Sequence, residues 1–92
     1  MSNKVVHDPD KQRYEIRVDG ILAGITEAHE NGEVVTFPHT KVFEQFEGQG
    51  LAGELVAGAL DDVRVHGKKI IAECPYVARF VEKHQDYADL LA

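Results

Sequence analysis

Six consecutive residues, Gly48-Gln49-Gly50-Leu51-Ala52-Gly53, have the composition of a phosphate-binding segment. Glycine and alanine let the backbone approach a ligand closely, because little or no side chain stands in the way. The apolar residues that follow recur at helical spacing, so the segment leads into the first turn of a predicted helix. That turn carries unpaired N–H groups and the positive end of the helix dipole. We therefore expect these main-chain amides to bind a phosphate group.

The same residues satisfy the pattern G-x-G-x-x-G, which raises two other nucleotide sites. In a dinucleotide-binding fold the glycines follow a buried parallel strand directly, and an acid about twenty residues further on, here Glu73, binds a ribose. Residues 44–47 instead separate the glycines from a strand that contains Pro38, and the chain has room for a single β-α-β crossover. A P-loop needs Gly-Lys-Ser/Thr after the glycines, which this sequence lacks. Both patterns are therefore disfavoured.

Two side chains outside this segment have types that suit proton transfer or nucleophilic chemistry. Cys74 directly precedes Pro75, and proline favours the first position of a helix, so the thiol is predicted at a helix N-terminus. Such positions lower the pKa of a cysteine below its free value of about 8.5 and favour the nucleophilic thiolate. His39 is of the type that serves as a general base near neutral pH. A small buried cysteine and a hydrogen-bonded strand histidine are the structural alternatives.

The strands that must position these groups follow from alternating apolar and polar residues. Tyr14, Ile16 and Val18 alternate with charged residues, which is typical of a half-buried strand. Asp19-Gly20 and Asn31-Gly32 are predicted type I′ hairpin turns, because these residues tolerate positive φ. The result is an antiparallel meander with a short edge strand before it. The predicted strands cover residues 5–6, 14–18, 21–29 and 34–42.

Pro38 falls within the last of these strands. Proline cannot donate a hydrogen bond to a neighbouring strand, so this strand must bulge, lie at an edge or splay from its neighbour. The main-chain groups of the next residues, His39-Thr40-Lys41-Val42, are therefore expected to face a ligand.

Two helices are predicted to pack on this sheet. The first runs from Leu51 to about His66 and ends at Gly67, a residue type common after helix C-termini. A short strand over 70–73 follows, then a second helix from about Pro75 and a helical turn over 86–92. The predicted fold is therefore α+β (mixed α/β), an antiparallel meander that leads through a β-α-β crossover.

The composition limits the number of domains and the kinds of partner that the chain can have. Ninety-two residues, 43% hydrophobic and 28% charged, predict one globular domain over residues 1–92. A formal net charge of −6 argues against nucleic acid as a partner and is compatible with a cationic amine. Cys74 is the one cysteine, and no apolar run is long enough for a signal peptide or a membrane span, so we expect a cytoplasmic protein without a membrane partner. The histidines show no metal-ligand spacing, so no metal site is expected.

The glycine segment and the interrupted strand before it resemble the GNAT superfamily of acyl-CoA-dependent N-acetyltransferases. The pyrophosphate-binding motif of that superfamily reads Gln/Arg-x-x-Gly-x-Gly/Ala, and Gly50 and Ala52 match its last two positions. Glu47 occupies the Gln/Arg position, a departure that leaves binding to main-chain amides. The resemblance implies a GNAT-like fold and coenzyme A as the ligand.

Three blocks of sequence, in the same order, resemble the small YjdJ-type N-acetyltransferases of that superfamily. The blocks are Phe37-Pro38-His39-Thr40, Phe46-Glu47-Gly48-Gln49-Gly50-Leu51-Ala52-Gly53, and Cys74-Pro75-Tyr76-Val77 with Phe80 and His84. The residues implied to bind coenzyme A are Thr40, Lys41, Val42, Glu47, Gly48, Gln49, Gly50, Leu51, Ala52, Gly53 and Tyr76.

The resemblance implies transfer of an acetyl group from acetyl-CoA to a primary amine, by direct attack or through Cys74, with His39 as general base. Tyr76 and Tyr87 are two further candidates for protonating the departing thiolate, a role that tyrosine has in the superfamily. The alternative function is a coenzyme A-binding regulatory module with little turnover. A thinly covered sheet face is consistent with a monomer or a weak homodimer.

Overall fold

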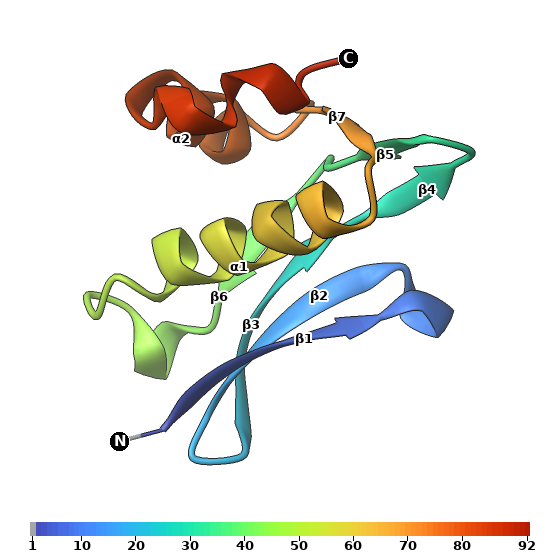
Figure 1. Cartoon of the computed structure of the whole chain (residues 1–92). Helices are drawn as coiled ribbons and strands as arrows, with labels where there is room; N and C mark the ends of the chain where they lie inside the picture. The colour runs from blue at the N-terminus through green and yellow to red at the C-terminus, as the bar shows by residue number, and fades with distance from the viewer. Residues whose placement is uncertain (1) are drawn as a thin grey trace.

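The computed structural model describes residues 2–92 and contains strands packed around a long helix, with a second helix above it (Figure 1). The strands are β1 (Asn3–Asp8), β2 (Arg13–Val18), β3 (Ile21–Glu27), β4 (His29–Asn31), β5 (Val34–Thr36), β6 (Thr40–Val42) and β7 (Lys69–Ile71). The α-helices are α1 (Leu51–Val65) and α2 (Pro75–Lys83). The 3-10 turns are η1 (Pro9–Lys11), η2 (Glu44–Phe46) and η3 (Gln85–Leu90).

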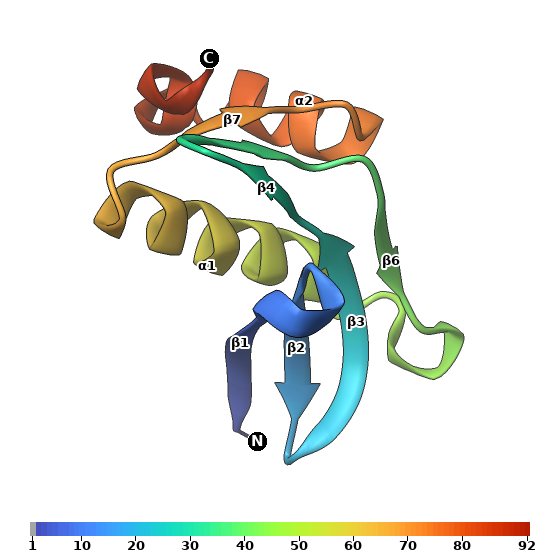
Figure 2. The ribbon, with the colours of Figure 1, turned by 90° about the vertical axis from the view of Figure 1, so that its right-hand side faces the viewer.

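The strands form two connected sheets (Figure 2). One is antiparallel in the order β1-β2-β3-β6, and the other has the order β4-β5-β7. Strands β5 and β7 pair in parallel, and α1 lies between them in the chain. This arrangement is the predicted β-α-β crossover. The α+β prediction is therefore confirmed.

The predicted strands 21–29 and 34–42 are wrong as single strands, because each divides between the two sheets. The second divides around Pro38, and its two halves have different partners. The Phe37 N–H donates to the Ile71 carbonyl at 2.9 Å, whereas the His39 carbonyl accepts from the Glu27 N–H at 2.8 Å. The chain thus leaves β7 before the proline and joins β3 after it. This is the splay that an interior proline predicts.

The two predicted hairpin turns have different outcomes. Asp19 and Gly20 have φ of 50° and 84°, as a type I′ turn requires at both central residues. In the second turn Gly32 has φ of 64°, but Asn31 still pairs with Val34 and belongs to β4. The prediction of Asn31-Gly32 as the central pair is therefore wrong by one residue.

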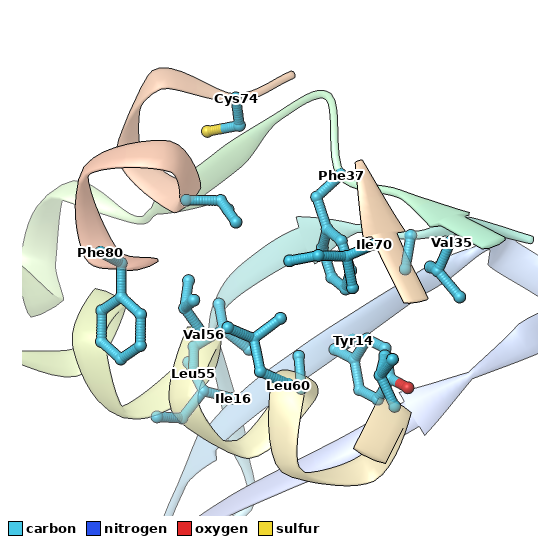
Figure 3. Close-up of a cluster of buried hydrophobic side chains, with 14 of the residues drawn as sticks. Tyr14, Ile16, Val35, Phe37, Leu55, Val56, Leu60, Ile70, Cys74 and Phe80 are labelled. Carbon is cyan, nitrogen blue, oxygen red and sulfur yellow. The ribbon is translucent and has the colours of Figure 1, made fainter. Parts of the chain in front are cut away.

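The hydrophobic core lies between the sheets and α1. Phe37 and Ile70, both fully buried, point toward Leu60 and Tyr14, while Cys74 lies at the margin of the cluster (Figure 3). Gly67, with φ of 70°, follows α1 as predicted, and α2 begins at Pro75. The strand predicted at 70–73 is observed as β7, which begins one residue earlier and ends two residues earlier, and the tail forms η3. Within residues 2–92, every helix falls short of what a membrane crossing requires in length and apolar content.

Gly58 allows β1 to pack closely on α1, and we expect Gly58→Ala to destabilise the protein. A β-carbon at Gly58 would lie 2.9 Å from the Val5 side chain. Overpacking costs about 1–3 kcal/mol, which exceeds the roughly 0.5–1 kcal/mol that alanine gains over glycine inside a helix. Urea unfolding of Gly58→Ala, Val5→Ala and the double variant measures the coupling. Additive effects of the two substitutions would show that this contact does not limit the packing.

Candidate functional site

The N-terminus of α1 presents unpaired amides, as the glycine segment predicts. Gly48 and Gly50 have φ of 81° and 73°, a conformation that strains any residue with a side chain. Gly50 is the N-cap of α1 and its carbonyl accepts from the Glu54 N–H at 3.3 Å. Among the described residues, none accepts a hydrogen bond from the amides of Leu51, Ala52 or Gly53. Three donors at the positive end of a fifteen-residue helix are thus available to an anion.

A cavity of about 500 Å³ opens directly beside this turn. One wall is Gly53 of α1, and the other comes from α2 and its C-cap residue. Its lining residues are Gly53, Pro75, Tyr76, Arg79, Phe80, Lys83 and His84. Tyr76, implied by the resemblance, is 41% exposed, and its hydroxyl would lie 3.5 Å from a β-carbon on Gly53. The cavity therefore joins the unpaired amides to an aromatic and basic surface.

Arg79 and Lys83 are functional candidates that the sequence reasoning missed. They lie four residues apart on α2, so both side chains project from one face of the helix. Neither forms an ion pair or a side-chain hydrogen bond with another described residue. Two cations on one helical face of an acidic chain were a visible signal, but only the packing of α2 beside α1 connects them with the glycine segment.

Strand β6 has one open side, and alternation decides which residues face it. Hydrogen bonds join Phe43 to Ala23 and His39 to Glu27, so residues 39, 41 and 43 pair with β3. The N–H and C=O groups of Thr40 and Val42 consequently point away from β3, to the unpaired edge. Lys41 was implied to bind through its main chain, but its main-chain groups are directed to β3.

Cys74 lies where β6 and the end of β7 separate. It is the N-cap of α2, as predicted, and is 5% exposed. Its N–H donates to the Phe37 carbonyl at 2.7 Å, and its thiol donates to Thr40 Oγ1 at 3.5 Å. The structure therefore brings Cys74 together with Thr40, the first residue of β6.

His39 and Cys74 are not on the same side of the sheet. The Thr40 side chain points inward, because its hydroxyl contacts the buried hydroxyl of Thr26 at 2.8 Å. Successive residues of an extended chain face opposite sides, so the exposed side chain of His39 points outward. A group held between β6 and the end of β7 would have the histidine on one side and the thiol on the other.

The remaining predicted residues occupy the loop before α1 or other contacts. Glu47 and Gln49 are exposed, whereas the side chain of Leu51 is buried, which leaves only its main chain to a ligand. Tyr87 packs on Phe80, and its hydroxyl donates to Asp61 at 2.8 Å. Burial, followed by this hydrogen bond, raises the pKa of Tyr87 to about 12. No group of three His, Cys, Asp or Glu side chains within residues 2–92 is arranged to hold a metal ion.

Comparison with known proteins gives a family match over most of the chain. The model of the family described as GCN5-related N-acetyl-transferase matches residues 13–90. Protein NATD1 of Mus musculus is 26% identical over 83 residues, which cover 88% of this chain and 76% of the relative. The Danio rerio protein of the same name is 28% identical over 90 residues, with coverage of 94% and 82%.

Two solved structures share the fold. A GCN5-like putative N-acetyltransferase from Staphylococcus aureus superposes with a TM-score of 0.73 at 22% identity, covering 100% of this chain and 91% of the other. A ribosomal-protein-alanine N-acetyltransferase from Brucella melitensis biovar Abortus superposes with a TM-score of 0.62, also at 22% identity, covering 87% and 60%.

Proposed function

The chain belongs to the GCN5-related N-acetyltransferase family, and from that membership we propose that it transfers the acetyl group of acetyl-CoA to a primary amine. One observation carries the proposal: the turn of unpaired amides that starts α1 borders a basic cavity, and the α2 wall of that cavity begins at Pro75, directly after Cys74. This arrangement suits a ligand with phosphates at one end and a thioester at the other.

The residues of the site fit coenzyme A. The amides of Leu51, Ala52 and Gly53 would bind its diphosphate, and Arg79 and Lys83 would add positive charge beside it. Amide and carbonyl groups at the β6 edge would bind the pantetheine arm in the manner of an added strand. When bound, acetyl-CoA supplies an acetyl group already activated as a thioester. The three sequence blocks support a finer assignment to the YjdJ-type members.

We favour direct attack by the amine over an acetylated Cys74. The Cys74 thiol is buried, with its sulfur 3.5 Å from the Thr40 hydroxyl, so it is enclosed by the protein rather than presented to a substrate. Holding two reactants in place can itself supply several kcal/mol of the barrier, roughly 7–11 in favourable cases. His39, exposed on the outer side, is then the group that accepts a proton from the incoming ammonium.

This mechanism predicts different effects for two alanine variants. His39→Ala should lower kcat by about 100-fold, the lower range for loss of a general base. Cys74→Ala should retain turnover within about tenfold, because no bond to sulfur is needed. The assay follows acetyl-CoA consumption with a panel of primary amines, with Cys74→Ser as a matched control. Mass spectrometry that finds acetyl on Cys74, together with loss of activity in both cysteine variants, would establish the covalent route instead.

The proposed function itself is tested by ligand-induced stabilisation and turnover. Acetyl-CoA and CoA should raise the melting temperature, since a ligand of the folded state stabilises by RT ln(1 + [L]/Kd). NAD should leave it unchanged. Stabilisation by NAD alone would contradict the assignment. Binding of CoA without turnover of any amine would favour the regulatory module, a function that Glu47 in the binding loop makes the second candidate.

A further inference from the structure

Strands β3 and β6 pack closely at Gly24, because this residue has no side chain. Gly24 pairs with Val42, and a β-carbon at Gly24 would lie 2.8 Å from the Lys41 carbonyl oxygen. The φ of Gly24 is not in the left-handed region, so space rather than conformation requires glycine here. The next residue of β3 on the same side is Thr26, directly opposite Thr40.

Thr26 is fully buried, and its hydroxyl lies 2.8 Å from the Thr40 hydroxyl. Its contact with the His39 carbonyl is longer, at 3.5 Å, beyond the usual length of an O–H···O hydrogen bond. Either hydroxyl can donate the 2.8 Å bond, and with Thr26 as its donor the Thr40 hydrogen stays free for another acceptor. The Thr40 oxygen also lies 3.5 Å from the Cys74 sulfur. These two contacts hold the Thr40 hydroxyl in place beside Cys74.

The hydroxyl pair is expected to add little to stability. A buried hydrogen bond contributes about 1 kcal/mol net, and replacing both partners by apolar groups of similar shape is close to neutral. Two valines would fill nearly the same volume on the inner face of the sheet. Removing one partner alone leaves the other polar group without its hydrogen bond. What the pair supplies is therefore the orientation of Thr40.

We propose that Thr26 is a positioning residue for acetyl transfer: it locks the Thr40 hydroxyl beside Cys74, where that hydroxyl meets the thioester end of acetyl-CoA. The inference rests on the proposed function. Thr26 itself touches no substrate and acts through Thr40. Binding of the rest of coenzyme A depends on main-chain amides, so it does not need Thr26.

The test compares Thr26→Val, Thr26→Ser and Thr26→Val/Thr40→Val with the wild type. Thr36→Val is the matched control, because it makes the same chemical change on β5. The Thr36 side chain forms no hydrogen bond with another described residue. Scalar couplings measured by NMR on the free protein report the Thr40 rotamer. We expect a single Thr40 rotamer in the wild type, in Thr26→Ser and in the control. In Thr26→Val the couplings should show that Thr40 exchanges between rotamers.

In kinetics, Thr26→Val should lower kcat about tenfold with little change in KM, the loss expected for one hydrogen bond made in the transition state. The double variant should melt like the wild type and have the same low kcat. An unchanged kcat and a fixed Thr40 rotamer in Thr26→Val would overturn the inference, as would kcat losses that merely follow the melting temperature. Should the wild type fail to bind acetyl-CoA in calorimetry, the proposed function fails, and the rotamer measurement still decides whether Thr26 orients Thr40.

Discussion

Replacing Gly53 by aspartate is expected to abolish binding of coenzyme A while leaving the fold at least as stable as before. Gly53 lies in the first turn of α1 and lines the basic cavity. An acidic residue there interacts favourably with the helix dipole, by about 0.3–1 kcal/mol, and replacing a helical glycine gains a similar amount. The same carboxylate would face the diphosphate and compete for the amides that bind it. Stability and function should therefore change in opposite directions.

Gly53→Asn is the matched control, because asparagine has nearly the same volume and no charge. A like-charge contact at a binding site costs several kcal/mol, so the aspartate variant should bind CoA at least about 100-fold more weakly than the asparagine variant. Isothermal titration calorimetry gives the affinities and urea unfolding gives the stabilities. Equal CoA affinities of the two variants would place the diphosphate away from Gly53.

Reversing the charge of Arg79 and Lys83 should have the second largest effect. Both side chains line the cavity and neither has an ionic partner within residues 2–92, so Arg79→Glu/Lys83→Glu should fold normally. Two cations become two anions beside the expected phosphates, and CoA affinity should fall about 100-fold or more. The loss should shrink as salt is added, because salt screens exposed charges.

Lys4→Glu/Lys11→Glu controls for the overall change in charge. Both lysines are exposed and lie on the β1 side of the molecule, outside the cavity lining. Both double variants have the same net charge. Calorimetry at low and high salt should find near wild-type affinity for the lysine control. If the two double variants lose affinity equally, the cavity does not bind the phosphates.

The fold was predictable from sequence where a local pattern decides the structure. Alternation identified β2, and the Asp-Gly pair identified the turn after it. Pro38 predicted that its strand must splay, but not that the first half joins β7 and the second joins β3. That exchange depends on a parallel pairing between strands separated by the whole of α1. No local pattern carries such a pairing, so the strand over 34–42 was predicted as one.

The same distinction applies to the site. The phosphate-binding turn was predictable because glycine positions and helix start are adjacent in sequence. Arg79 and Lys83 were not, since their relevance depends on α2 packing beside the start of α1. The opposite orientations of His39 and Cys74 were also hidden, because Cys74 meets Thr40 only through tertiary packing.

The most direct test of the account is an NMR titration of the wild-type protein with CoA, followed through the glycine amide signals. Gly50 and Gly53 lie at the predicted diphosphate site, whereas Gly20 and Gly32 lie in distant hairpin turns. The account predicts large shifts for the first pair, saturating at one equivalent of CoA, and none for the turn glycines. An unchanged spectrum at excess CoA, or shifts confined to the hairpins, would contradict it.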